Sequence, residues 1–103
     1  MEKEQLRVLL ENWSNLMVRK FDGLTIRFEY NESHQCYLVS YNRLHNNEQA
    51  NKFYRLLIKF ERMFENDYPF NAPLFSENNR LFKLSDKAKT ISKNSPAMDN
   101  QNR

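Results

Sequence analysis

His34 and Cys36 are the two residues of this chain whose types and spacing come closest to a catalytic pair. Residues two apart in a strand point to the same face, so a histidine there could activate the thiol as a nucleophile. The neighbouring sequence supplies no obvious orienting group, oxyanion donor or cleft. A turn histidine followed by a strand cysteine is the simpler interpretation, and we predict that the protein is not an enzyme.

Metal and cofactor sites need residues that this sequence does not supply at suitable spacings. A structural zinc site needs four ligands, usually cysteine or histidine, and the chain has one cysteine and two histidines. Its single glycine, Gly23, cannot build a glycine-rich phosphate loop. Glu61 and Glu65 share one side of a predicted helix, where a solvated flank is the ordinary interpretation. We therefore expect no cofactor, no metal and no small-molecule substrate.

Four basic residues form a ridge along the second predicted helix. Lys52, Arg55, Lys59 and Arg62 follow one another at helical spacings, and only Glu48 offsets their charge locally. This basic ridge could dock the phosphates of a nucleic acid or an acidic protein. The alternative is a solvated face whose long side-chain stems cover the edge of the core. Nucleic-acid binding through the ridge and the basic tail is therefore our alternative function.

The segment ENDYPFNAPLFSENN, residues 65–79, places four apolar side chains around two prolines. Tyr68, Phe70, Leu74 and Phe75 could cover the open end of the core, because a small domain needs most of its aromatics inside. They could also form a surface that receives a partner, since clustered exposed apolar residues mark interaction sites. The two roles are compatible, with Phe70 or Phe75 left outside as an anchor.

Composition predicts one domain in the cytoplasm. The chain has 103 residues, of which 40% are hydrophobic and 14% aromatic, enough for one core. One glycine and three prolines argue against an all-β fold, which needs many tight turns. A single cysteine excludes an internal disulfide framework. The charged N-terminus does not resemble a signal peptide, and no apolar run approaches the ~20 residues that span a bilayer.

The basic character of the chain lies mostly in its C-terminal part. Residues 1–85 carry 12 Lys and Arg against 11 Asp and Glu, a net charge of +1. Residues 86–103 carry 4 against 2, a net charge of +2. The folded part is thus close to neutral, and global charge is weak evidence for a nucleic-acid partner.

The hydrophobic periodicity predicts two amphipathic helices, at residues 2–20 and 47–67. Gly23 is suited to a left-handed position after the first helix. Asn46 or Asn47 is suited to the N-cap of the second, and Asn46 with Gln49 fits a capping box. The predicted buried stripe of the first helix is Leu6, Leu9, Leu10, Trp13, Leu16 and Met17, with Val8 and Val18 off the stripe. The predicted stripe of the second helix is Ala50, Phe53, Leu57, Phe60 and Phe64.

Alternating apolar and polar residues predict a β-hairpin over residues 24–41. With a turn centred on Glu32 and Ser33, all the large cross-strand pairs fall on one face. The predicted pairs are Phe28–Tyr37, Ile26–Val39 and Leu24–Tyr41. The opposite face is predicted to be solvated, except at Leu38.

The remaining chain predicts one short strand and a tail. Leu81 to Leu84 is expected to add a third strand at the hairpin's edge, and residues 85–103 are predicted to be a mostly disordered basic tail. The predicted fold class is α+β, a two-layer sandwich in the order α-β-β-α-(β). Two helices pack on a small antiparallel sheet, and residues 1–84 form the single domain.

The absence of catalytic groups and the surplus of apolar side chains favour a protein-binding role. We predict a small non-enzymatic cytoplasmic domain that binds another protein or a second copy of itself, with no membrane partner. The partner-binding residues predicted are Tyr68, Phe70, Leu74 and Phe75. The surplus apolar residues are Val8, Val18, Leu38, Ile58, Phe70 and Phe75.

Overall fold

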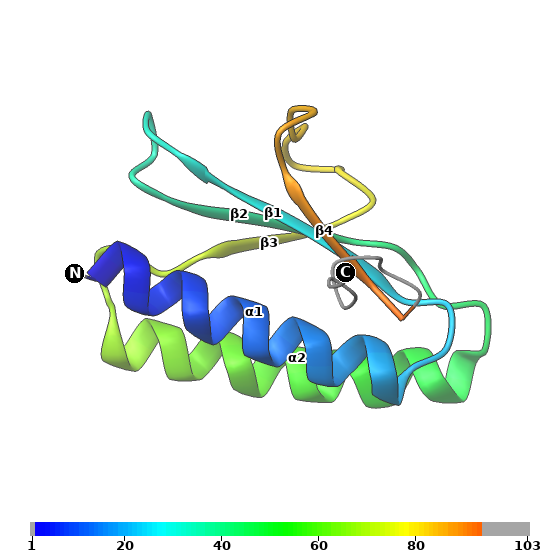
Figure 1. Ribbon diagram of the computed structural model, residues 1–103. Helices are drawn as coiled ribbons and strands as arrows, with labels where there is room; N and C mark the ends of the chain where they lie inside the picture. Colours follow the sequence, from blue (N-terminus) through cyan, green and yellow to red (C-terminus); the bar gives the residue numbers. More distant parts are fainter. Residues whose placement is uncertain (1, 94–103) are drawn as a thin grey trace, which may run out of the picture.

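The structure is a computed structural model that describes residues 2–93 of the chain. Figure 1 shows the strands as one layer and both helices as a second layer on one face of the sheet. The fold is an α+β two-layer sandwich, and the predicted order of helices and strands is confirmed. The elements are α1 (Glu2–Lys20), β1 (Thr25–Asn31), β2 (Cys36–Tyr41), α2 (Asn47–Asp67), β3 (Leu74–Glu77) and β4 (Lys89–Ser92).

The sheet is mixed, which corrects the prediction of an antiparallel sheet. Its strand order is β3-β2-β1-β4. β1 pairs antiparallel with both β2 and β4, whereas β2 and β3 run parallel. The reason is the connection between β2 and β3: α2 carries the chain back along the sheet, so that β3 starts at the same end as β2.

The hairpin of β1 and β2 has a register that differs by two residues from the predicted one. The observed pairs include Ile26–Tyr41, Phe28–Val39 and Tyr30–Tyr37. The turn is centred on Ser33 and His34, because Asn31 Oδ1 accepts a hydrogen bond from the His34 backbone N at 2.8 Å. Gln35 then takes a positive φ of 54° before β2 begins. A shift of two residues leaves every side chain on its predicted face.

α1 ends before a left-handed glycine, as predicted, but its buried face is rotated from the predicted stripe. Gly23 has a φ of 86°. Val18 is 1% exposed and Leu16 is 60% exposed, the reverse of the prediction. Val18 follows the fully buried Leu10 and Ser14 at spacings of eight and four residues, which places it on the face towards the sheet.

α2 begins and ends at the predicted residues. Asn46 caps its first turn, with Oδ1 accepting a hydrogen bond from the Gln49 backbone N at 2.9 Å. Tyr68, which precedes a proline, has a φ of −137° and lies outside the helical region. Four residues of the predicted stripe are buried: Ala50, Phe53, Leu57 and Phe64.

Aromatic side chains hold the two layers together. Trp13 of α1 stacks on Phe60 of α2, with ring centroids 4.3 Å apart. Phe75 of β3 meets Trp13 edge-on at 6.1 Å, and Phe53 of α2 meets Tyr41 of β2 at 5.3 Å. Such edge-to-face contacts each add ~0.5–1.5 kcal/mol beyond the area that they bury. The helices are therefore fixed both to one another and to the sheet.

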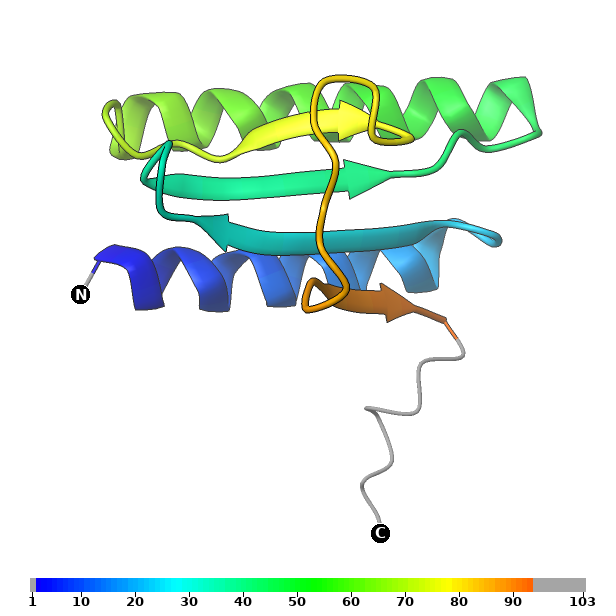
Figure 2. The ribbon, with the colours of Figure 1, turned by 90° about the horizontal axis from the view of Figure 1, so that it is seen from above.

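A second apolar cluster covers the outer face of the sheet, which corrects the prediction that this face is solvated apart from Leu38. Cys36 and Leu38 of β2 are buried there under Leu84, with Phe82 and Ala88 packed around them. Figure 2 shows the chain leaving β3 and crossing this face to reach β4 on the far side of β1. We call residues 78–88 the crossover segment.

The crossover segment also replaces the strand predicted at residues 81–84, which does not form. Asn78 and Asn79 take positive φ values of 51° and 59° and turn the chain away from β3. Glu29 then accepts hydrogen bonds from Ser85, at 3.0 Å from its backbone N and 2.6 Å from its Oγ. This segment is thus held by side chains across a sheet face, whereas its apolar run predicts an edge strand.

β4 extends the folded part of the chain beyond the predicted boundary at residue 84. Ile91 is 3% exposed and lies opposite Ile26 of β1. Lys89 Nζ lies 3.0 Å from Glu11 Oε2 and Lys93 Nζ lies 2.6 Å from Asp22 Oδ1, which joins this edge to α1 and its C-terminal turn. One buried isoleucine and two ion pairs order a segment whose composition predicts a disordered tail. The remainder of the predicted tail lies outside the described residues.

The length and hydropathy of the helices within residues 2–93 test whether either could cross a membrane. Neither α1 nor α2 has a stretch that is long and apolar enough to cross a bilayer. Both carry polar residues on the face turned away from the sheet, as amphipathic surface helices do.

Candidate functional site

The edge of the sheet at β3 carries an apolar pocket of about 280 Å³, which we call the β3-edge pocket. β3 is the end strand of the sheet, and no strand within residues 2–93 pairs with its outer side. β3 and its neighbours on the outer face line the pocket with apolar side chains. These side chains are Leu38, Pro73, Leu74, Phe75, Leu81 and Phe82, and His34 of the hairpin turn also lines the pocket.

The four predicted partner-binding residues divide between the core and the surface. Tyr68 is half-buried against the main core, and Phe75 is 9% exposed and packs into it. Phe70 is 93% exposed and Leu74 is 47% exposed. The segment therefore closes the core with two side chains and leaves two exposed, Leu74 on β3 and Phe70 in the loop that leads to β3.

Two carboxylates, Glu61 and Glu65, line the β3-edge pocket from the α2 side. Neither carboxylate forms an ion pair with a described residue. Partial burial raises the pKa of Glu61, and the neighbouring charge of Glu65 raises it further. The pocket thus combines apolar walls with two carboxylates and the imidazole of His34, and neither carboxylate is held in an ion pair by a described residue.

The basic ridge of α2 is exposed along its whole length. Lys52 Nζ lies 4.0 Å from Glu48 Oε2, the local offset that the sequence predicts. Arg55, Lys59 and Arg62 have no carboxylate partner among residues 2–93. Three adjacent cations are therefore available on the surface of the helix.

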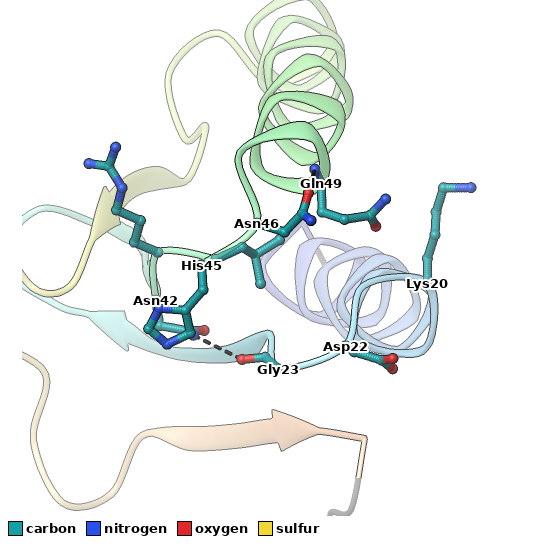
Figure 3. Close-up of a pocket in the computed structure, with 9 residues that line it drawn as sticks. Lys20, Asp22, Gly23, Asn42, His45, Asn46 and Gln49 are labelled. Atoms are coloured by element: carbon teal, nitrogen blue, oxygen red, sulfur yellow. Dashed lines mark hydrogen bonds between the residues drawn. The ribbon is translucent and has the colours of Figure 1, made fainter.

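A polar pocket of about 430 Å³ lies where the start of α2 meets the turn after α1 (Figure 3). Asn42 holds this turn, accepting a hydrogen bond from the Thr25 backbone N at 2.7 Å and donating one to the Gly23 carbonyl at 2.9 Å. Asn46 occupies the helix N-terminus with its own side chain. The side chains of Asn42 and Asn46, which line this pocket, thus hold the loops around it.

His34 and Cys36 do not form the paired arrangement that nucleophilic catalysis needs. His34 is exposed at the hairpin turn, where its Nδ1 lies 2.9 Å from Asn31 Oδ1. Cys36 is buried under the crossover segment, and this burial raises the pKa of its thiol. A buried thiol with a raised pKa is a poor source of thiolate at neutral pH.

Metal ligation has no candidate cluster within residues 2–93. No three side chains from His, Cys, Asp and Glu come together there in a way that could hold a metal ion.

Sequence reasoning missed the β3-edge pocket because it misplaced the residues that build it. The sequence pattern predicts a strand for Leu81 and Phe82 and a solvated flank for Glu61. One signal could have placed Glu61: it follows the buried Leu57 by four residues and precedes the buried Phe64 by three. Those spacings put it on the border of the apolar stripe. No comparable signal marks where the crossover segment lies.

Comparison of the chain with protein-family models, with curated proteins and with solved structures finds no match.

Proposed function

We propose that this protein is a non-enzymatic module that binds another protein through the edge of the sheet at β3. The observation that carries the proposal is three large apolar side chains exposed on β3 and on the loops that precede and follow it. Phe70 is 93% exposed, Leu81 is 78% exposed and Leu74 is 47% exposed. Exposed apolar residues beside a pocket are typical of interaction sites, and aromatic anchors supply much of the energy of an interface.

Affinity capture tests this proposal with matched variants. Phe70→Ser combined with Leu81→Ser removes two exposed apolar side chains from the β3 edge. Val8→Ser combined with Leu16→Ser removes two from α1, where the exposed fractions are 42% and 60%. From a nuclease-treated lysate, the wild type and the α1 control are expected to retain the same protein, and the β3-edge variant to lose it. Equal retention by all three, or no retained protein, would contradict the proposal.

Nucleic-acid binding through the basic ridge is the second candidate function. Exposed Arg55, Lys59 and Arg62, with no carboxylate partner among the described residues, favour it. Binding through phosphate contacts falls steeply as salt concentration rises. Arg55→Glu with Lys59→Glu is expected to abolish retention on RNA or DNA if the ridge is the contact. Retention that is unchanged by this double reversal would assign the ridge to the solvated surface.

The cytoplasm is the compartment that we propose for this protein. The support is chemical: the single cysteine, Cys36, is a free thiol buried in the outer cluster. A protein that uses no disulfide suits a reducing environment.

A further inference from the structure

The two edges of the sheet are protected very differently. The β4 edge carries Lys89 and Lys93, both engaged in ion pairs with the α1 region. Lysines on an edge strand are a common device against unwanted strand pairing. β3 has the sequence LFSE, with no lysine, and follows Pro73 directly. Leu74 is half-exposed, whereas Phe75 and Ser76 are buried and Ser76 Oγ accepts a hydrogen bond from the Leu81 backbone N at 2.9 Å. Because β3 carries no lysine and has no strand partner on its outer side within residues 2–93, its edge is the one better suited to a further strand.

α2 runs beside this edge and would contact a strand added there. Figure 2 shows this helix running alongside β3, on the helix side of the sheet. Its flank towards β3 carries the half-exposed Ile58 and the pocket residues Glu61 and Glu65. Tyr54, one turn before Ile58, donates a hydrogen bond to Glu77 of β3 at 2.6 Å, which fixes the helix to the strand. A strand added at β3 would have this flank on one face and Leu81 on the other.

The two carboxylates on this flank of α2, Glu61 and Glu65, favour a basic side chain on the added strand. Glu61 and Glu65 line the pocket together with His34 and form no ion pair with a described residue, and partial burial raises the pKa of Glu61. Like charges in a partly desolvated site are relieved when an opposite charge binds. A lysine or arginine extending from the added strand would meet both carboxylates, and its aliphatic stem would pack on the apolar walls.

We propose that the β3 edge takes up an extended segment of a partner protein, in which lysine or arginine alternates with apolar residues. The segment adds a fifth strand to the sheet by main-chain hydrogen bonds to β3. Its basic side chains face Glu61 and Glu65, and its apolar side chains face Leu74 and Leu81. This mode of strand addition takes affinity from the main chain and specificity from alternate side chains. The inference rests on the proposed function and names the chemistry of the partner.

A second copy of this chain is a less suitable occupant. Strand-to-strand pairing about a twofold axis would bring two β3 edges together. Because α2 runs along the same edge, both α2 helices would also have to meet there, each needing about 8–10 Å of interaxial space. Strands of a pair lie only about 4.8 Å apart, so a single extended segment fits this edge better than a second folded copy.

A displayed library of random nine-residue linear peptides, selected on the full chain, tests the inference. The selected peptides are expected to alternate lysine or arginine with apolar residues. The best peptide is then synthesised and its Kd measured by fluorescence anisotropy. Glu61→Gln with Glu65→Gln is expected to weaken binding by about tenfold or more, the effect of about one charge-assisted contact. The control Glu4→Gln with Glu48→Gln, outside the pocket, is expected to change Kd by less than about twofold.

Hydrogen exchange and oligomeric state complete the test. Bound peptide is expected to slow amide exchange in residues 74–77, because main-chain pairing protects those amides. No selected peptide, a selection for acidic peptides, unchanged Kd in the Glu61/Glu65 variant, unaltered exchange or a dimer joined at β3 would each overturn the inference. If a captured protein depends on Phe70 and Leu81 but not on Glu61 and Glu65, this inference fails and the proposed function stands.

Discussion

Replacing Leu84 by alanine tests whether the crossover segment packs on the sheet. Leu84 is 6% exposed and caps the outer cluster over Cys36 and Leu38. Leu→Ala changes at buried sites cost ~2–5 kcal/mol. The outer cluster is small and its rim can relax, so we expect the lower end, about 2 kcal/mol in the free energy of unfolding. At ~4–8 °C per kcal/mol for a domain of this size, the melting temperature should fall by roughly 8–16 °C.

Leu81→Ala is the matched control, because Leu81 lies in the same segment but is 78% exposed. It is expected to change the free energy of unfolding by no more than about 0.5 kcal/mol. Urea titration followed by circular dichroism measures both variants, and equal slopes indicate that the same surface is exposed on unfolding. Equal stabilities for the two variants would refute the packing of the crossover segment and would indicate that the outer face of the sheet is solvated.

Three further substitutions test other features of the fold. Ser14→Ala should raise the free energy of unfolding by about 1 kcal/mol in urea titration, because Ser14 Oγ is buried with no hydrogen-bond partner among the described residues and alanine favours helix. Gly23→Ala should lower the melting temperature through a loss of about 1 kcal/mol, because its φ of 86° is unfavourable for a side chain although no atom lies within 4 Å of the added Cβ. Glu61→Gln should stabilise the protein at neutral pH. The pKa of Glu61 is higher in the native state than in the unfolded state, so ionisation of the wild-type carboxyl lowers the free energy of unfolding, and glutamine removes that loss. That gain should vanish in melts at pH values below the ordinary pKa of a glutamate, where the wild-type carboxyl is protonated in both states.

Local patterns predicted the elements that have a strong period and clear ends. α2 has a five-residue apolar stripe, an asparagine cap and a proline after its last turn, and each signal agrees with the others. The hairpin kept its faces although its register moved by two residues, because side chains in a strand alternate with a period of two. Register itself depended on the Asn31 side chain in the turn, which hydrophobic patterning does not describe.

The features that sequence reasoning missed depend on contacts between distant residues. Ser85 meets Glu29 across 56 positions, and Lys89 meets Glu11 across 78. The composition of residues 85–93 predicts a solvated segment, because Ile91 is its only large apolar residue. That one residue is enough for a four-residue edge strand once β1 supplies the pairing partner. The β3-edge pocket was missed for the same reason, since it joins side chains from α2, β2, β3 and the crossover segment.

The course of the crossover segment also explains why β3 is left at the edge. A strand over residues 81–84 beside β3, as patterning predicts, would have occupied the outer side of β3. The chain instead turns at Asn78 and Asn79, buries Leu84 on the sheet face and pairs β4 with β1. The burial that stabilises the outer face therefore leaves the main-chain groups on the outer side of β3 without a strand partner in the described chain. If Leu84→Ala releases this segment, Leu81 loses its position over the pocket. Peptide binding at β3 should then weaken even under conditions where the rest of the domain stays folded, which links the stability of the crossover segment to recognition at the edge.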